Sequence, residues 1–147
     1  MTKRLATILC ALCALGFIGT VQPAGATTTV FDFDSSHTTA QFAVKHLVVS
    51  TVRGRMGQVT GTLQFDPADP SKSTVEATID VRGIDTNDAK RDEHLRAPDF
   101  FDVATYPTIK FKSKSAARAA DGKYKVTGDL TIKGVTTGVT RSEFEYV

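Results

Sequence analysis

Tryptophan is absent from this sequence, and cysteine occurs only twice in 147 residues. Both cysteines, Cys10 and Cys13, lie near the N-terminus, within an apolar run from Leu5 to Ile18. The chain after this run contains no cysteine, which excludes a disulfide framework there. The fold must therefore depend on its hydrophobic core alone.

The first 26 residues have the features of a secretory signal peptide. Lys3 and Arg4 precede the apolar run, and the small residues Ala24-Gly25-Ala26 form a cleavage signal. The run is short for a membrane span, which argues against the alternative of an uncleaved anchor. We expect residues 1–26 to be a signal peptide, residues 27–147 to form one domain, and the protein to be periplasmic.

An excess of charge of one sign is also lacking. The chain has 18 basic and 16 acidic residues, and Lys3 and Arg4 in the expected signal peptide account for the difference. A balance near zero gives no case for a nucleic-acid partner or for a polybasic attachment to membranes.

Long helical patterns are missing, whereas alternation of apolar and polar residues recurs along the chain. In the segment Thr39–His46, for example, Phe42, Val44 and His46 fall on one face. Short links suit antiparallel neighbours, and Asp121-Gly122 is a hairpin signal. Seven strands are predicted, at Thr28–Phe33, Thr39–His46, Val59–Asp66, Thr74–Val81, Thr108–Ser115, Lys123–Lys133 and Val139–Val147.

These strands fit either a sandwich or an up-and-down barrel. Small residues at inward positions, such as Gly61 and Gly128, favour the barrel because glycine allows a strand to bend. The segment 47–58, rich in small and basic residues, is expected to be a connection. We predict an all-β fold, an antiparallel barrel with one short helix.

The segment Gly83–Asp102 interrupts the alternation with a crowd of charged residues. Asp85, Thr86 or Asn87 is suited to cap a short helix, which Pro98 would end. The helix has almost no apolar stripe, so we expect a lid over one end of the β structure. The lid would turn two aromatic rings inward, those of Phe100 and Phe101.

A series of short motifs resembles the YceI-like family. Each motif is weak alone, but their order and spacing are specific and extend over roughly residues 28–140. They are Asp34-Ser35-Ser36-His37, Phe42-Ala43-Val44-Lys45-His46, Ser50-Thr51-Val52-Arg53-Gly54, Ile84-Asp85-Thr86, Arg91-Asp92-Glu93-His94-Leu95, Pro98-Asp99-Phe100-Phe101-Asp102, Tyr106-Pro107 and Leu130-Thr131-Ile132-Lys133-Gly134-Val135-Thr136.

The resemblance implies an exported bacterial protein whose lipocalin-like antiparallel barrel encloses a long apolar ligand, such as a polyprenyl chain or a quinone. It implies a non-enzymatic carrier that needs no cofactor. The apolar chain of the ligand would contact Phe42, Val44, Phe65, Ile79, Phe100, Phe101 and Phe111. The polar end of the ligand would contact His46, Arg53, Arg91 and His94.

The sequence departs from the family in its length, since members usually continue with another strand that closes the barrel. An eight-stranded barrel is about the smallest that holds one small ligand. A missing closing strand would leave an edge with unpaired backbone groups, which invites pairing with a second copy. The expected barrel of about seven strands is therefore incomplete or is closed by a second copy, and a homodimer through the exposed strand edge is a further expectation.

Two simpler interpretations compete with a lipid site. All phenylalanines except Phe17 follow the expected signal peptide, and they could equally fill a solid core. Four cationic residues could hold a phosphate head group of the lipid by charge-assisted hydrogen bonds: Arg53, Arg55, Lys90 and Arg91. In the competing interpretation the cations of the helix only pair with acidic neighbours, as in Asp88–Arg91 and Asp92–Arg96.

The alternative function is a metal-dependent or hydrolytic periplasmic enzyme. It would use His37, His46 or His94, with Asp85 or Asp92 as a further metal ligand. The histidines lack ligand spacing such as H-x-x-x-H and fall on different elements. No G-x-S-x-G motif is present either. We therefore assign no catalytic and no metal-binding residue from the sequence.

Overall fold

A computed structural model of the chain describes residues 28–46, 50–120 and 122–144. The expected signal peptide lies outside these residues. Seven strands, one α-helix and one short 3₁₀ helix make up the described part. They are β1 (Thr29–Asp32), β2 (Thr39–His46), β3 (Ser50–Phe65), η1 (Pro70–Lys72), β4 (Thr74–Asp80), α1 (Ala89–Arg96), β5 (Thr108–Arg118), β6 (Tyr124–Ile132) and β7 (Val135–Phe144).

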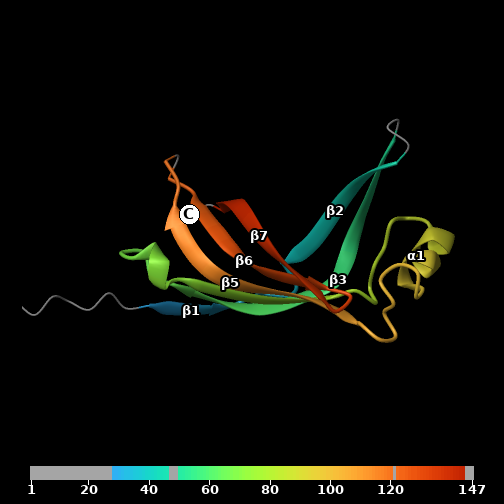
Figure 1. Ribbon diagram of the computed structural model, residues 1–147, viewed down its shortest axis with the longest axis horizontal. Helices are drawn as coiled ribbons and strands as arrows, with labels where there is room; N and C mark the ends of the chain where they lie inside the picture. The colour runs from blue at the N-terminus through green and yellow to red at the C-terminus, as the bar shows by residue number, and fades with distance from the viewer. Residues whose placement is uncertain (1–27, 47–49, 121, 145–147) are drawn as a thin grey trace, which may run out of the picture.

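The strands form one antiparallel sheet in the order β1-β3-β4-β5-β6-β7, with β2 also paired to β3. The long strand β3 carries both β1 and β2 along one edge, because β1 pairs with its second half and β2 with its first. The sheet curves into a trough, and β2 with the first half of β3 rises from one end as an arm beside α1 (Figure 1).

The predicted fold class is confirmed, with seven antiparallel strands and one short helix. The strand at the end of the sheet order is β7, and among the described residues it pairs only with β6. Within this part of the chain the sheet is therefore open.

The prediction of a connection over residues 47–58 is wrong for most of its length, because β3 begins at Ser50. The register with β2 shifts between the pairs Thr39↔Gln58 and Gln41↔Arg55, so β3 has one residue more than β2 there. Such a bulge bends the strand and breaks its alternation. The sequence pattern therefore resembles a loop, although the backbone is extended on both sides of the bulge.

One face of the sheet, which we call the inner face, carries most of the apolar side chains. Register places Ala77 beside Phe111 and Phe111 beside Leu130 on this face. The rings of Phe65 and Tyr124 meet edge to face, 5.3 Å apart, although β4 and β5 separate their strands in the sheet. The sheet must therefore coil strongly, and the buried residues Phe65, Ala116, Tyr124 and Val126 form its core at the end away from α1.

The N-cap of α1 lies one residue after the last of the three predicted cap residues. This N-cap is Asp88, whose side chain accepts a hydrogen bond from Arg91 N. The prediction that Asp85, Thr86 or Asn87 caps the helix is therefore wrong. The predicted end is confirmed, because the cap residue Ala97 is extended and precedes Pro98.

Candidate ligand-binding face

The inner face continues onto the arm formed by β2 and β3. Phe42 pairs with Gly54 and Val44 with Val52, and residues opposite each other in an antiparallel pair share a face. A methyl group at Gly54 would lie 2.5 Å from the Phe42 ring and 2.8 Å from Cγ2 of Thr86. The Phe42 ring therefore lies against the segment that leads into α1.

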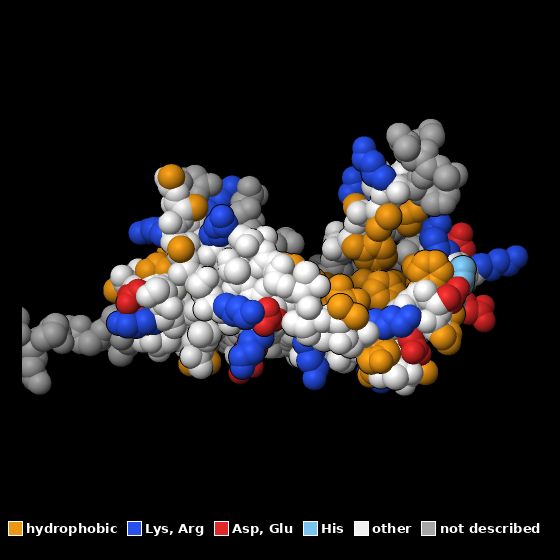
Figure 2. All heavy atoms as spheres, in the orientation of Figure 1, with side chains coloured by type: hydrophobic (Ala, Val, Ile, Leu, Met, Phe, Trp, Pro, Cys, Tyr) orange, Lys and Arg blue, Asp and Glu red, His pale blue; other side chains and the backbone are white. Residues whose placement is uncertain are grey.

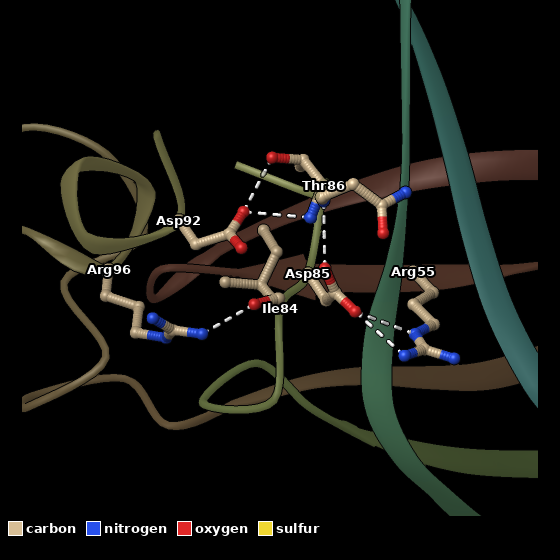
Figure 3. Close-up of polar contacts among 7 residues, drawn as sticks. Arg55, Ile84, Asp85, Thr86, Asp92 and Arg96 are labelled. Atoms are coloured by element: carbon tan, nitrogen blue, oxygen red, sulfur yellow. Dashed lines mark hydrogen bonds and ion pairs between the residues drawn. The ribbon is translucent and has the colours of Figure 1, made fainter. Parts of the chain in front are cut away.

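This segment is joined to β3 through Arg55 and Asp85 (Figure 3). Their backbones exchange two hydrogen bonds of 2.9 Å. Nε and Nη2 of Arg55 also donate to Oδ2 of Asp85, at 3.1 and 2.8 Å. A hydrogen bond from the Asn87 backbone and the neighbouring Arg55 guanidinium together hold the pKa of Asp85 below its usual value.

Buried polar contacts attach α1 to the same segment. Oδ1 of Asp92 accepts hydrogen bonds from the Thr86 backbone at 2.8 Å and from the Thr86 hydroxyl at 2.6 Å. Arg91 donates to the same hydroxyl at 2.7 Å. Arg96 donates to the carbonyl oxygen of Ile84 at 2.6 Å (Figure 3). Polar bonds thus attach α1 to the segment that precedes it.

The structure distributes the predicted apolar contacts over the length of the trough. Phe65 is buried in the core at the far end, and Ile79 and Phe111 lie half-buried near the middle of the sheet. Phe42 is half-buried and Val44 exposed on the arm. The turns after α1 place Phe100 in solvent and leave Phe101 half-buried; these residues are thus spread along the trough rather than gathered in one cluster.

The predicted polar contacts do not converge on one point. Arg53 pairs with Ala43, so it occupies the face of the arm opposite Phe42 and Val44. Arg91 is bound to Thr86, and His94 lies 2.9 Å from Asp99 with its ring edge-on to Phe100. The side chain of His46 lies outside the part of the chain that the structure describes.

The expected pairing of charges along α1 is correct for one pair only. Arg91 lies 3.8 Å from Asp88. Asp92 and Arg96 form no ion pair in the described structure, because Asp92 binds Thr86 while Arg96 donates to the carbonyl oxygens of Arg82 and Ile84. The roles of Asp92 and Arg96 in attaching α1 could not be found from helical spacing, since their partners precede the helix.

Two open hollows accompany the trough. One, of about 270 Å³, is lined by Gln41, Arg53 and Arg55 on the outer face of the arm, together with Asp85 and Asn87. The other, of about 320 Å³, lies over β3, β4 and β5, and its lining combines Gly61, Ala77 and Phe111 with the polar residues Thr62, Glu76, Thr78, Lys110 and Lys112. Neither is a closed tunnel.

The Asp34, Ser36 and His37 side chains cluster in the turn between β1 and β2. Ser36 Oγ and Asp34 Oδ2 both face Nδ1 of His37, at 3.2 and 2.5 Å. In a catalytic triad the hydroxyl and the carboxylate contact opposite nitrogens of the histidine ring. Here both contact the same nitrogen, so these three residues do not form a catalytic triad. Hydrogen bonds from Ser36 and then His37 lower the pKa of Asp34 to about 2.

Among the described residues, no group of three or more histidine, cysteine, aspartate or glutamate side chains is arranged to hold a metal ion. In the same part of the chain, no helix has both the length and the apolar character needed to cross a membrane.

Both the sequence and the fold of this chain match those of known proteins. The profile of the YceI-like domain matches residues 31–143. A relative from Shewanella denitrificans is 42% identical over 111 residues, which cover 76% of this chain and 58% of the relative. The chain thus spans less than two thirds of the length of that relative.

Two solved structures share the fold. BcnA from Burkholderia cenocepacia has 34% sequence identity and a TM-score of 0.65, over 69% of this chain and 64% of that protein. A polyisoprenoid binding domain from Saccharophagus degradans has 15% identity and a TM-score of 0.60, over 79% and 66%. The second likeness concerns the fold alone. With the match of the domain profile over most of its length, the chain belongs to the YceI-like family.

Proposed function

We propose that this protein binds and carries a long isoprenoid-type lipid, such as a polyprenyl chain or a quinone, along the inner face of its curved sheet. The observation that carries the proposal is the series of mainly apolar positions that the strand register places on the inner face, from the buried end at Phe65 to the arm at Phe42 and Val44. The polyisoprenoid binding domain of Saccharophagus degradans, which shares the fold, supports the choice of ligand.

The energetics favour an apolar ligand over a polar one. Covering apolar surface contributes roughly 25 cal/mol per Å², so a chain of several isoprene units binds without any catalytic group. The polar groups near the helix already bind one another, as Arg55–Asp85 and Arg91–Thr86 do. The binding energy is therefore assigned to the chain of the lipid rather than to its head group.

The direct test is extraction of the purified protein with organic solvent, followed by mass spectrometry and by uptake of an added polyprenyl phosphate. A lipid should co-purify with the protein or be taken up. If neither occurs, the proposal fails.

A matched pair of variants locates the site. Val44→Asp places a charge on the exposed inner face of the arm, whereas Lys45→Asp changes the neighbouring exposed residue on the outer face. We expect Val44→Asp to weaken uptake about tenfold, because a carboxylate would replace an apolar contact worth about 1.5 kcal/mol or more. Lys45→Asp should bind as the wild type does, and equal effects of the two variants would place the ligand elsewhere.

We also propose that residues 1–26 direct export to the periplasm and are then removed. Sequencing the N-terminus of the protein from a periplasmic fraction tests this directly. A first residue at Thr27 is expected, whereas a chain that keeps Cys10 and Cys13 would contradict it.

A further inference from the structure

Six large apolar side chains of the described residues are exposed, and four of them lie at the end of the trough that carries α1. Phe100 is 46% exposed, Tyr106 37%, Val135 67% and Val44 56%. We call these four residues the mouth patch. Figure 2 shows apolar side chains gathered at the foot of the arm and over the end of the molecule that carries α1.

Specific contacts hold three of these residues together. Lys133 donates to the carbonyl oxygen of Pro98 at 2.6 Å, which ties the β6–β7 turn to the loop that carries Phe100. A methyl group at Gly134 would lie 3.0 Å from the Tyr106 ring, so Gly134 packs closely against this ring. Val135 is the next residue in the chain. Val44 lies on the inner face of the neighbouring arm, where it pairs with Val52.

The loop between α1 and β5 is an ordered series of turns, and these turns set the exposure of Phe100. Its backbone makes successive hydrogen bonds, among them Phe100 N to Ala97 O, Phe101 N to Leu95 O and Tyr106 N to Asp102 O, between 2.8 and 3.0 Å. An apolar ring held in water by an ordered turn is costly, and a patch of such residues marks an interaction surface.

We propose that the mouth patch docks on the surface of a lipid bilayer. This inference rests on the proposed function, because an isoprenoid lipid resides in membranes and its transfer through water would expose its apolar chain. The patch is continuous with the inner face along which that lipid would lie. Tyr106 adds an amphipathic ring of the kind that is enriched where membranes meet water.

The charges around the patch decide how it binds. Residues 82–106 together with Lys133 carry five basic and six acidic side chains, so this segment has no strong excess of either sign. Attraction to anionic head groups would therefore be weak, and insertion of apolar side chains must supply the binding energy. Binding to neutral vesicles that is insensitive to salt follows, since salt screens only the charged contribution.

The absence of tryptophan from the chain allows a clean reporter. Phe100→Trp places one indole in the mouth patch, and Val30→Trp places one at an exposed position on β1, remote from α1 in the sheet. On addition of phosphatidylcholine vesicles, the emission of Phe100→Trp should shift to the blue at low and high salt alike. The emission of Val30→Trp should stay unchanged.

A charge at the same position gives the quantitative test. In vesicle co-sedimentation, Phe100→Asp should partition about tenfold more weakly than the wild type, because one exposed phenylalanine loses its burial in the bilayer. Unchanged emission of Phe100→Trp, or binding that needs anionic lipid and disappears at high salt, would overturn the proposal. Self-association that Phe100→Asp abolishes would assign the patch to a second copy and overturn it as well.

Uptake of a polyprenyl phosphate from detergent, without vesicles, separates this inference from the proposed function. Normal uptake without vesicle binding removes the docking surface alone. Vesicle binding without uptake preserves the docking surface and removes the proposed ligand.

Discussion

Gly54 occupies a position on β3 where a side chain has no room. A methyl group there would come within 2.8 Å of both the Phe42 ring and the Thr86 side chain, whereas a methyl group at Gly138 on β7 would meet nothing within 4 Å. Both positions are in strands, so the two substitutions differ mainly in crowding.

We expect Gly54→Ala to lower the free energy of unfolding by about 1–3 kcal/mol, because the Phe42 ring or the segment at Thr86 must move. Gly138→Ala should change it by less than about 0.5 kcal/mol. Urea denaturation of both variants checks this. A Gly54→Ala variant as stable as the wild type would mean that the ring swings away at no cost.

The individual residues of the site were only partly predictable. Alternation correctly placed Phe42 and Val44 on one face, because residues two apart in a strand point the same way. It could not place Arg53 relative to a ligand, since that side chain belongs to the other face of the arm. Nor could it identify Asp92 as the acceptor for Thr86, because the capping rules concern the residue next to the helix, whereas Thr86 lies two residues before the N-cap Asp88.

At the scale of elements, β2 was predicted with its observed bounds and β3 was predicted nine residues too short at its start, at Val59 instead of Ser50. The difference lies in the bulge. β2 keeps its alternation through the bulge, whereas the extra residue in β3 shifts the pattern of that strand between Arg55 and Gln58. A bulge is set by pairing with a second strand, which a single segment does not reveal.

The helix α1 depends on buried polar bonds to its neighbours. Asp92 is 7% exposed and accepts both the backbone N–H and the hydroxyl of Thr86, which is itself buried. Asp92→Ala would leave these donors without an acceptor, at a cost of about 1–3 kcal/mol. The neighbouring Glu93 is exposed on the same helix, so Glu93→Ala is a matched control.

Because the lost bonds join α1 to the segment before it, the effect should appear first as local opening. We expect amide hydrogens of residues 84–96 to exchange at least about tenfold faster in Asp92→Ala, with smaller changes in the core strands. Glu93→Ala should leave exchange unchanged. Equal acceleration over the whole sheet would show instead that α1 and the sheet unfold as one unit.

For the whole molecule, the two ends of the trough differ. One end is closed by the contact of Phe65 with Tyr124 and by the buried residues around it. The other end exposes Val44, Phe100 and Val135 beside a helix attached by polar bonds. A lipid seated along the inner face would therefore have its chain at the closed end and its access at the end that carries α1.

One edge of β7 has no strand partner among the described residues, and a second copy could pair there. Among the described residues β7 pairs with β6 alone, and the sequence of the strand, VTTGVTRSEF, contains neither proline nor lysine, which commonly protect an edge. We propose that two copies pair through this edge. An isologous pair would satisfy the backbone groups of both β7 strands that have no partner among the described residues, and it would join the two inner faces.

The position of Thr137 allows this pairing to be tested. Thr137 pairs with Leu130 and shares the inner face, whereas Thr136 pairs with Thr131 on the outer face, and both threonines are exposed. A lysine at Thr137 would point inward at the joint between the copies, where its charge would be desolvated, whereas a lysine at Thr136 would stay in water. Light scattering should give a dimer for the wild type and Thr136→Lys, and a monomer for Thr137→Lys. A wild-type monomer at all concentrations would exclude pairing through β7, and lipid uptake by that monomer would then be a property of the single open trough.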